Sequence, residues 1–453
     1  MTQNLLVASD RVGPAKPPRG YRAGLRRRVR RVQREARRAP GRVTQMLHKL
    51  PISPHIRHEL ARVVLWSPGS SQIAIDDALL GGQNGLSAAE YAAATGDLFW
   101  PSRRVVDGPH AELLRRSRNA GELSDEEILD SPYGQMAARS IDVSGQYFSA
   151  TDAAGIVEIA RDFIDRTFSD DPGATTTRAR QSRAGTPILV APIAHSDMYQ
   201  VVDGHHRIAS LAIQGRETFP ARVRRSRVRT PVQDLLEEMS WIGGNQELYQ
   251  PIDAPELERD WATVRRCTDR LGAMDQVTAR LGIEPDTSSY LDVASCYGWF
   301  VAKMRDRGFD AYGIERDPLA PSLGVGAYGL DPNRISVGDA VELLTANQRR
   351  YDVVSCFSLL HHFVLGRGST DAEGLLELLD QATGRVLFLD TGQANEAWFK
   401  ESLPEWDPPF IAKFLEKNST FDEIIDWGPD ADAVPPYQDN YGRHLFACIR
   451  MST

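Results

Sequence analysis

From Tyr290 onward, short apolar runs alternate with segments of helical periodicity, and this alternation constrains the fold more than any other feature of the sequence. The run Tyr290–Ala294 precedes a segment with apolar residues at helical spacing, and a second run, Ala311–Ile314, follows it. Further strands are predicted at Arg334–Val337, Tyr351–Cys356, Arg385–Asp390 and His444–Arg450. Strands that alternate with helices build a mostly parallel sheet with helices on its faces. We therefore expect an α/β domain in residues 285–453.

The turn after the first predicted strand contains small side chains, which would let a ligand approach the backbone. It reads Asp292-Val-Ala-Ser-Cys-Tyr-Gly298 and opens the next helix. Glu315 ends the second strand, at the spacing of about 20 residues where an acid accepts hydrogen bonds from ribose hydroxyls. Asp339 would end the third strand. Together the turn and Glu315 fit a ligand that carries a ribose.

The order and spacing of these elements resemble the class I methyltransferases that use S-adenosylmethionine (SAM). The resemblance implies a Rossmann-like fold with a seven-stranded, mostly parallel sheet, and SAM as the cofactor. By this resemblance, the residues expected to bind SAM are Asp292, Ala294, Ser295, Cys296, Gly298, Glu315, Asp339, Ala340 and Phe357. The turn departs from the family, since Ala294 and Cys296 replace its first two glycines and only Gly298 remains. A nicotinamide-dependent dehydrogenase is the rival, but Cys296 stands where a pyrophosphate requires glycine.

Two histidines and three further residues are the candidates for chemistry at this site. Methyl transfer to a hydroxyl requires alignment of the acceptor and removal of its proton. His361 and His362 follow the fourth predicted strand, whose carboxyl end faces the crevice of an open parallel sheet. A histidine with an ordinary pKa of about 6.5 suits this task, although either ring could instead pack or hold a helix start. For the acceptor pocket we select Tyr297, Asp390 and Trp398.

The amino-terminal half contains a second strand-to-helix turn, Asp203-Gly-His-His-Arg207. It resembles the ParB and sulfiredoxin-like superfamily, in which a Gly-x-x-Arg turn opens a helix and binds nucleotide phosphates. The resemblance implies phosphate or nucleotide binding by Asp203, Gly204, His205, His206 and Arg207. Free amides at a helix start and an arginine would supply the donors. Alternatively, the domain keeps the fold without the chemistry and recruits a substrate or forms a dimer.

The expected organisation has four parts: a basic arm (1–50), a ParB-like α+β domain with an extension (51–227), a helical linker (228–284) and the methyltransferase domain (285–453). The linker is expected to include a helix over Pro255–Leu281. The chain has a net charge of −8, yet its first 50 residues carry a large excess of Arg and Lys. This arm could contact anionic lipid or nucleic acid, pack on the acidic body, or be a solvated tail.

Composition restricts the class of protein and its surroundings. The longest apolar stretches fall well short of the roughly 20 residues that span a bilayer, so no transmembrane helix is expected. Four cysteines show neither paired spacing nor a metal-ligand pattern. This argues against a metal site and for a reducing compartment, the cytoplasm.

We therefore expect a SAM-dependent enzyme that methylates an oxygen of a small-molecule or sugar-like acceptor. One alternative is a nucleic-acid (DNA) methyltransferase, because the basic arm could bind phosphates. Asp407-Pro-Pro-Phe410 resembles the motif with which such enzymes grip a flipped base, but that motif belongs after the fourth strand, so this alternative is not favoured. A second alternative is a regulator that binds SAM or a nucleotide without catalysis.

Overall fold

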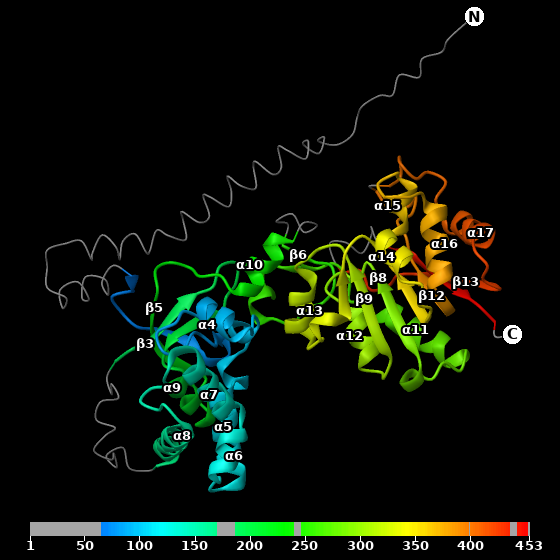
Figure 1. The fold of residues 1–453 in the computed structure, drawn as a ribbon. Coiled ribbons are helices and arrows are strands. Elements are labelled where there is room, and N and C mark those ends of the chain that lie inside the picture. Colours follow the sequence, from blue (N-terminus) through cyan, green and yellow to red (C-terminus); the bar gives the residue numbers. More distant parts are fainter. Residues whose placement is uncertain (1–64, 170–185, 240–245, 398, 435–441, 452–453) are drawn as a thin grey trace, which may run out of the picture.

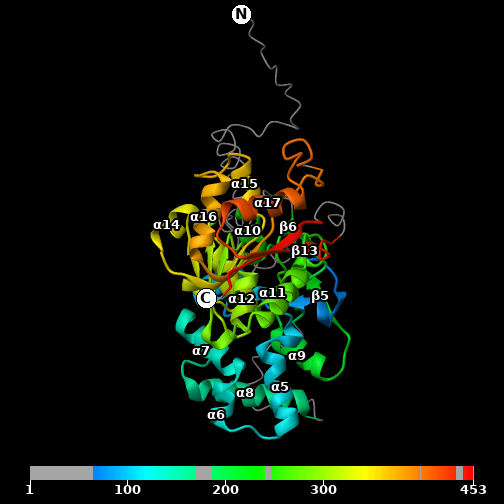
Figure 2. The ribbon, with the colours of Figure 1, turned by 90° about the vertical axis from the view of Figure 1, so that its right-hand side faces the viewer.

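The computed structural model describes residues 65–169, 186–239, 246–397, 399–434 and 442–451, so the basic arm and Trp398 lie outside it. Two larger sheets organise these residues, one in each half of the chain. Figure 1 shows two lobes joined through α10 (Pro231–Glu238) and β6 (Glu247–Leu248). Figure 2 gives the same arrangement from the side, with the helices of the amino-terminal lobe at the end far from the last helices of the chain.

The amino-terminal lobe is built on a five-stranded sheet with the order β1-β5-β3-β4-β2. Its strands are β1 (Ser71–Ala74), β2 (Ala78–Leu79), β3 (Ile188–Pro192), β4 (Tyr199–Asp203) and β5 (Thr218–Val223). Its α-helices are α4 (Ala88–Thr95), α5 (Pro109–Ala120), α6 (Asp125–Asp130), α7 (Pro132–Ser144), α8 (Ala153–Phe168) and α9 (His205–Ile213). The Asp152 side chain accepts a hydrogen bond from the Gly155 amide at 2.8 Å and caps the start of α8.

The segment between the lobes differs from the helical linker that the sequence suggested. It contains α10, a short parallel pair of β6 with β7 (Ala262–Thr263), a 3₁₀-helix at Pro255–Leu257 and α11 (Thr268–Arg280). The prediction of one helix over Pro255–Leu281 was therefore wrong. Cys267, the residue before α11, has a φ of 65°, a left-handed conformation that an α-helix does not continue through. Trp261 and Val264 are buried without being helical, so their spacing misled the prediction.

The carboxy-terminal lobe contains the expected seven-stranded, mostly parallel sheet, with the order β10-β9-β8-β11-β12-β14-β13. Its strands are β8 (Ser289–Val293), β9 (Asp310–Glu315), β10 (Ile335–Val337), β11 (Tyr351–Cys356), β12 (Thr383–Leu389), β13 (Glu423–Pro429) and β14 (His444–Ile449). The pairs from β10 to β12 are parallel, and β14 is antiparallel to both of its neighbours.

Alternation along these strands produces two hydrophobic cores, one on each face of the sheet. Tyr290 and Val353 face the core that includes α11, whereas Leu291 and Val354 face the opposite one. The helices of this lobe after α11 are α12 (Trp299–Arg305), α13 (Ala320–Tyr328), α14 (Ala340–Ala346), α15 (Leu360–Val364), α16 (Ala372–Ala382) and α17 (Pro408–Asn418). α12 packs with α11, and α14 to α17 cover the other face. None of the helices described in the structure has the length and apolar character needed to cross a membrane.

The two lobes meet through a shared hydrophobic cluster beside β8. Phe99 of the amino-terminal lobe packs there with Leu236 of α10 and with Tyr297. A Cβ atom added to Gly326 of α13 would lie 2.2 Å from the Phe99 ring, so only glycine fits at this contact. The turn after β8 is therefore packed against residues from outside its own domain.

Candidate functional site

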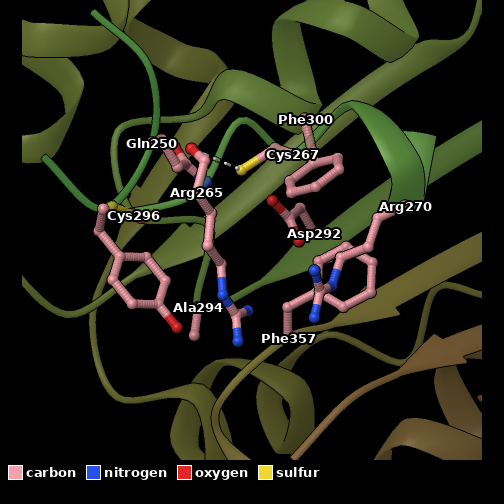
Figure 3. A pocket seen from close by; sticks show the side chains of 10 residues that line it. Gln250, Arg265, Cys267, Arg270, Asp292, Ala294, Cys296, Phe300 and Phe357 are labelled. Carbon is pink, nitrogen blue, oxygen red and sulfur yellow. Dashed lines mark hydrogen bonds between the residues drawn. The ribbon is translucent and has the colours of Figure 1, made fainter. Parts of the chain in front are cut away.

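A pocket opens at the carboxyl end of β8, where the turn into α12, the residue after β11 and the segment between the lobes converge (Figure 3). Its lining residues are Tyr249, Gln250, Arg265, Cys267, Arg270, Asp292, Ala294, Cys296, Phe300 and Phe357. Phe300 and Phe357 form an apolar side, with ring centroids 4.8 Å apart. Ligands of open parallel sheets bind at this edge, so the pocket lies where the topology predicts a site.

The turn after β8 has the backbone shape of a glycine-rich turn although two of its residues carry side chains. Ala294, Cys296 and Gly298 have φ angles of 63°, 56° and 87°. For a residue other than glycine, this left-handed conformation costs roughly 1–2 kcal/mol. Ala294 and Cys296 therefore add strain to this turn.

Gln250 holds this strained turn from outside the domain. Its Oε1 accepts hydrogen bonds from the amides of Tyr297 and Trp299, both at 3.1 Å, and its Nε2 donates to the carbonyl of Ser295 at 3.1 Å. The first amides of a helix lack partners within the helix, and Gly298 offers no side chain to cap α12. Gln250 supplies that cap. Sequence reasoning missed this residue because no local pattern marks a glutamine so far upstream of its partners.

Asp292 presents a carboxylate oxygen to the pocket. Its Oδ1 accepts a hydrogen bond from Ser355 Oγ at 2.6 Å, whereas Oδ2 is buried and has no hydrogen-bond partner among the described residues. Burial raises the pKa of Asp292 to about 7, and the nearby carboxylates of Glu315 and Asp390 act in the same direction. A buried acid that still has an unused oxygen is poised to accept a hydrogen bond from a cationic ligand.

The other acids predicted to bind SAM are engaged with the backbone. Glu315 Oε2 accepts from the Cys296 amide at 2.9 Å, and Oε1 accepts from the amides of Arg316 and Asp317. Asp339 caps α14 through the Val341 amide at 2.9 Å. The ribose and adenine roles of these acids stay predictions.

The structure brings only part of the predicted SAM set together. Asp292, Ala294, Cys296 and Phe357 line the pocket. Ser295, Gly298 and Glu315 belong to the same turn or bond to it, whereas Asp339 and Ala340 lie at the start of α14, outside the lining.

A buried group of charges forms one wall of the pocket. Arg270 Nε lies 2.6 Å from Asp390 Oδ2, and Arg270 Nη1 lies 2.6 Å from Asp430 Oδ2. Arg265 is within 3.5 Å of Asp390 and within 3.2 Å of Asp430. The side chains of both arginines are 3% exposed and those of the two acids 0%. Burial acts to raise the pKa of Asp390, but the guanidinium groups hold it well below its usual range.

This arrangement corrects the expected role of Asp390. We predicted that it would face an acceptor, but its carboxylate accepts from Arg270 and from the Ser358 amide at 2.7 Å. Asp390 therefore orients the arginines. Arg265 and Arg270 were missed because they precede the strand-and-helix pattern that identified the site.

The two histidines after β11 are less exposed to solvent than a general base would be expected to be. His361 is 4% exposed, and its Nδ1 accepts a hydrogen bond from the Gly392 amide at 3.0 Å. Burial, together with the nearby charge of Arg443, lowers the pKa of His361 to about 2. His362 is only half-buried, and its ring centroid lies 4.2 Å from that of His361. The geometry therefore disfavours proton transfer through His361, while the role of His362 stays a prediction.

Tyr297 does not line the pocket, contrary to the expectation that it would reach the acceptor. Its side chain is fully buried in the cluster that joins the lobes. The tyrosine in the pocket wall is Tyr249, from the segment between the lobes. Side chains of neighbouring residues in a tight turn point in different directions. The sequence places Tyr297 next to Cys296 but does not show that only Cys296 lines the pocket.

In the amino-terminal lobe, the predicted phosphate-binding turn connects β4 to α9. Gly204, with a φ of 120°, precedes the helix. Arg207 Nη2 lies 3.1 Å from Asp203 Oδ2, and Arg207 Nη1 donates to the carbonyl of Thr186. The arginine and the aspartate of the motif are thus paired with each other at the surface.

The two histidines of this turn are hydrogen-bonded within the amino-terminal lobe. His205 Nε2 accepts a hydrogen bond from the Gly81 amide at 2.8 Å, and His206 Nε2 lies 2.9 Å from the Tyr133 hydroxyl. Burial lowers the pKa of His205 to about 4 and lowers that of His206 as well. They therefore do not supply positive charge for a phosphate near neutral pH. Within the described ranges, no group of three or more His, Cys, Asp or Glu side chains is arranged to hold a metal ion.

Comparisons with known proteins agree with the fold of the carboxy-terminal lobe. Residues 266–422 match the family model of a methyltransferase domain, which assigns such a domain to this part of the chain. No curated protein matches the sequence.

Two solved structures illustrate the similarity. The bifunctional kinase-methyltransferase WbdD is 21% identical with a TM-score of 0.38, over 48% of this chain and 46% of that chain. The magnesium protoporphyrin IX methyltransferase ChlM of Synechocystis PCC 6803, with bound SAM, is 15% identical with a TM-score of 0.29, over 40% of this chain and 80% of that chain. The chain thus spans about half the length of the first of these proteins.

Proposed function

We propose that the chain is a SAM-dependent methyltransferase whose cofactor binds in the pocket at the end of β8. The observation that carries this proposal is the unpartnered Oδ2 of buried Asp292, which faces a pocket with an apolar side and two guanidinium groups. Such a lining fits a ligand with an aromatic ring and a charged amino-acid end. SAM, when bound, supplies an electrophilic methyl group.

The residues of the chain would align the acceptor and exclude water. Gln250 fixes the turn, and Tyr249 and Arg265 close the pocket from the segment between the lobes. We propose a hydroxyl of a small or sugar-like molecule as the acceptor. The segment between the lobes covers one side of the pocket, and such a pocket suits a small ligand better than a polymer. Of the two histidines, His362 is the proposed base, since His361 is held neutral and bonded.

The amino-terminal lobe is proposed to be a ParB-like module without phosphotransfer activity. Each charged or histidine side chain of its motif has a partner within this lobe. Its contact with the methyltransferase domain through Phe99 suggests that it positions the other lobe. Nucleotide binding at Arg207 is the second candidate function, since the pair with Asp203 is about half exposed and could open.

Calorimetry with SAM and S-adenosylhomocysteine (SAH) tests the cofactor assignment. We expect both to bind, and Asp292→Ala to weaken SAM binding about 10- to 100-fold, the usual range for a charge-assisted hydrogen bond. Asp275→Asn is the control, because Asp275 pairs with Arg307 at the surface of α11. Equal affinity of the wild type and Asp292→Ala would refute the assignment.

Radiolabelled SAM tests the acceptor class. Label should pass to members of a panel of small hydroxyl compounds and not to DNA at low salt. Transfer to DNA would favour the nucleic-acid alternative, and SAM binding without transfer to either would favour a regulator.

A further inference from the structure

Residues 249–257, which we call the connector, are bonded to both lobes. Near the start of the connector, Gln250 bonds to the turn after β8, as described above. The Tyr328 hydroxyl of α13 donates to the carbonyl of Pro251 at 2.7 Å. Toward the end of the connector, Glu256 bonds to the amino-terminal lobe. The same short segment therefore contacts the cofactor turn at one end and the other lobe at the other end.

Glu256 is a buried acid that the proposed chemistry does not use. It is 0% exposed, and its Oε1 accepts hydrogen bonds from Ser102 Oγ and from Thr230 Oγ1, the latter at 2.8 Å. Burial raises the pKa of Glu256, against the effect of these two hydroxyls. Ser102 belongs to a 3₁₀-helix of the amino-terminal lobe, and Thr230 caps the start of α10. Because a buried carboxyl group is costly to leave unpaired, these two bonds fix the position of the connector.

The 3₁₀-helix that carries Ser102 is itself held in the core of the amino-terminal lobe. Trp100 is buried in that core, where its Nε1 donates to the Gly81 carbonyl at 2.8 Å. The Gly81 amide donates to His205 Nε2, at the turn after β4. A Cβ atom added to Gly81 would lie 1.5 Å from the carbonyl oxygen of Val201, so only glycine fits beside β4 here. Tightly packed contacts thus lead from the turn after β4 to Ser102 and the connector.

The turn after β8 depends on such support because its backbone is strained. Ala294 and Cys296 have left-handed φ angles, which persist only where the surrounding structure imposes them. Gln250 also satisfies the amides of Tyr297 and Trp299, which have no partners within α12. A shift of Gln250 would remove these bonds together and let the turn relax away from the shape that binds the cofactor.

We propose that the connector couples the amino-terminal lobe to the cofactor site. Ser102 holds Glu256, Glu256 fixes the connector, and Gln250 keeps the turn after β8 in its binding shape. The inference rests on the proposed SAM binding. It makes Ser102 and Glu256 positioning residues, since both lie outside the pocket lining and outside the residues that match the family model. The amino-terminal lobe then sets the affinity for the cofactor without contacting it.

Calorimetry with SAH and the full chain tests this coupling. In Ser102→Ala, SAH should bind roughly 2- to 30-fold more weakly, the range for residues that modulate a site without contacting its ligand. Ser124→Ala is the matched control, because Ser124 caps α6 in the same lobe and bonds to Glu127 instead of the connector. An unchanged affinity in Ser102→Ala, or an equal loss in Ser124→Ala, would overturn the proposal.

A double-mutant cycle shows whether Ser102 acts through Gln250. Gln250→Met removes the bonds to the turn with little change in side-chain volume. In this background, Ser102→Ala should no longer change the affinity for SAH, because the connector has lost its bonds to the turn. The same fold-loss in both backgrounds would show that Ser102 acts by another route, and the proposal would be wrong.

Glu256 variants answer the same question if Gln250→Met fails to fold, as judged by near-ultraviolet circular dichroism. Glu256→Gln keeps the oxygen that accepts from Ser102 and Thr230, so its affinity for SAH should stay near that of the wild type. Glu256→Ala should weaken SAH binding, and adding Ser102→Ala to it should cause no further loss. Equal losses in Glu256→Gln and Glu256→Ala would count against the coupling.

Binding by the wild type separates this inference from the function on which it rests. If the wild type binds SAH and Ser102→Ala binds it equally well, the coupling is refuted while SAM binding stands. If the wild type does not bind SAH, the proposed function is refuted and the inference falls with it.

Discussion

The turn after β8 and the turn after β4 both place an aspartate at a strand end and a glycine before a helix, but the two aspartates are used differently. Asp292 is buried and keeps one oxygen unpartnered in a pocket, whereas Asp203 is about half exposed and pairs with Arg207. The first turn has its helix amides satisfied by Gln250, a distant residue. The two turns therefore differ in whether the protein itself pairs the aspartate, because only Asp292 keeps a carboxylate oxygen for a ligand.

The largest expected effect is on stability, where the buried charges near the first turn should matter more than the exposed ion pair at the second turn. Asp390→Ala leaves Arg265 and Arg270 with less negative charge in a buried site, and we expect a loss of about 3–5 kcal/mol in the free energy of unfolding. Asp203→Ala removes a partly exposed ion pair and should cost at most about 1 kcal/mol. Urea denaturation measures both, and similar losses would break the contrast.

Gly204→Ala tests the backbone of the second turn. Its φ of 120° is unfavourable for a residue with a side chain, and the added Cβ would lie 3.1 Å from Ile188. We expect the free energy of unfolding to fall by about 1–3 kcal/mol. Gly145→Ala, where φ is 79° and the Cβ meets no atom, separates strain from crowding. Equal losses in the two variants would show that crowding contributes nothing.

The pH dependence of cofactor binding tests the first turn. Asp292 must be ionised to pair with an ammonium group, and its pKa of about 7 means that protonation competes with binding below neutral pH. Affinity for SAH should therefore fall about tenfold between pH 8 and pH 6, as one proton is released on binding. Glu315 and Asp390, which face Asp292, help to raise this pKa, and the Ser355 hydroxyl lowers it.

Asp292→Asn provides the comparison for this pH profile. Its affinity should be weaker and nearly constant over the same range. A wild-type profile without any fall toward pH 6 would show that Asp292 does not bind the ammonium group as its carboxylate.

The smallest expected effect is a gain in stability at the first turn. Ala294 has a φ of 63°, which glycine adopts without steric cost. Ala294→Gly should therefore raise the free energy of unfolding by about 0.5–1 kcal/mol, after the greater flexibility of glycine in the unfolded chain is included. Thermal unfolding checks the direction, and destabilisation would indicate that the Ala294 methyl group packs favourably in the pocket wall.

The fold of the carboxy-terminal lobe could be predicted because its strands are marked locally. The run that begins at Tyr290 alternates between two cores, and the strands β11, β12 and β14 repeat this pattern. The same method failed for Pro255–Leu281, where Trp261 and Val264 are buried without helical structure. Apolar spacing reports which residues are buried, but it identifies a helix only where the backbone can continue as one.

The sequence by itself determined six strands of the sheet and the location of the turn from Asp292 to Gly298, because both depend on neighbouring residues, whereas β13 carried no such local pattern. Only the tertiary structure decided which polar groups are available there. The sequence suggested His361 as a base, but in the structure burial lowers its pKa. It suggested Asp390 as a contact for the acceptor, but in the structure Arg270 pairs with the Asp390 carboxylate. Burial and pairing depend on residues far apart in the chain, and Gln250, which holds the turn, is the clearest example.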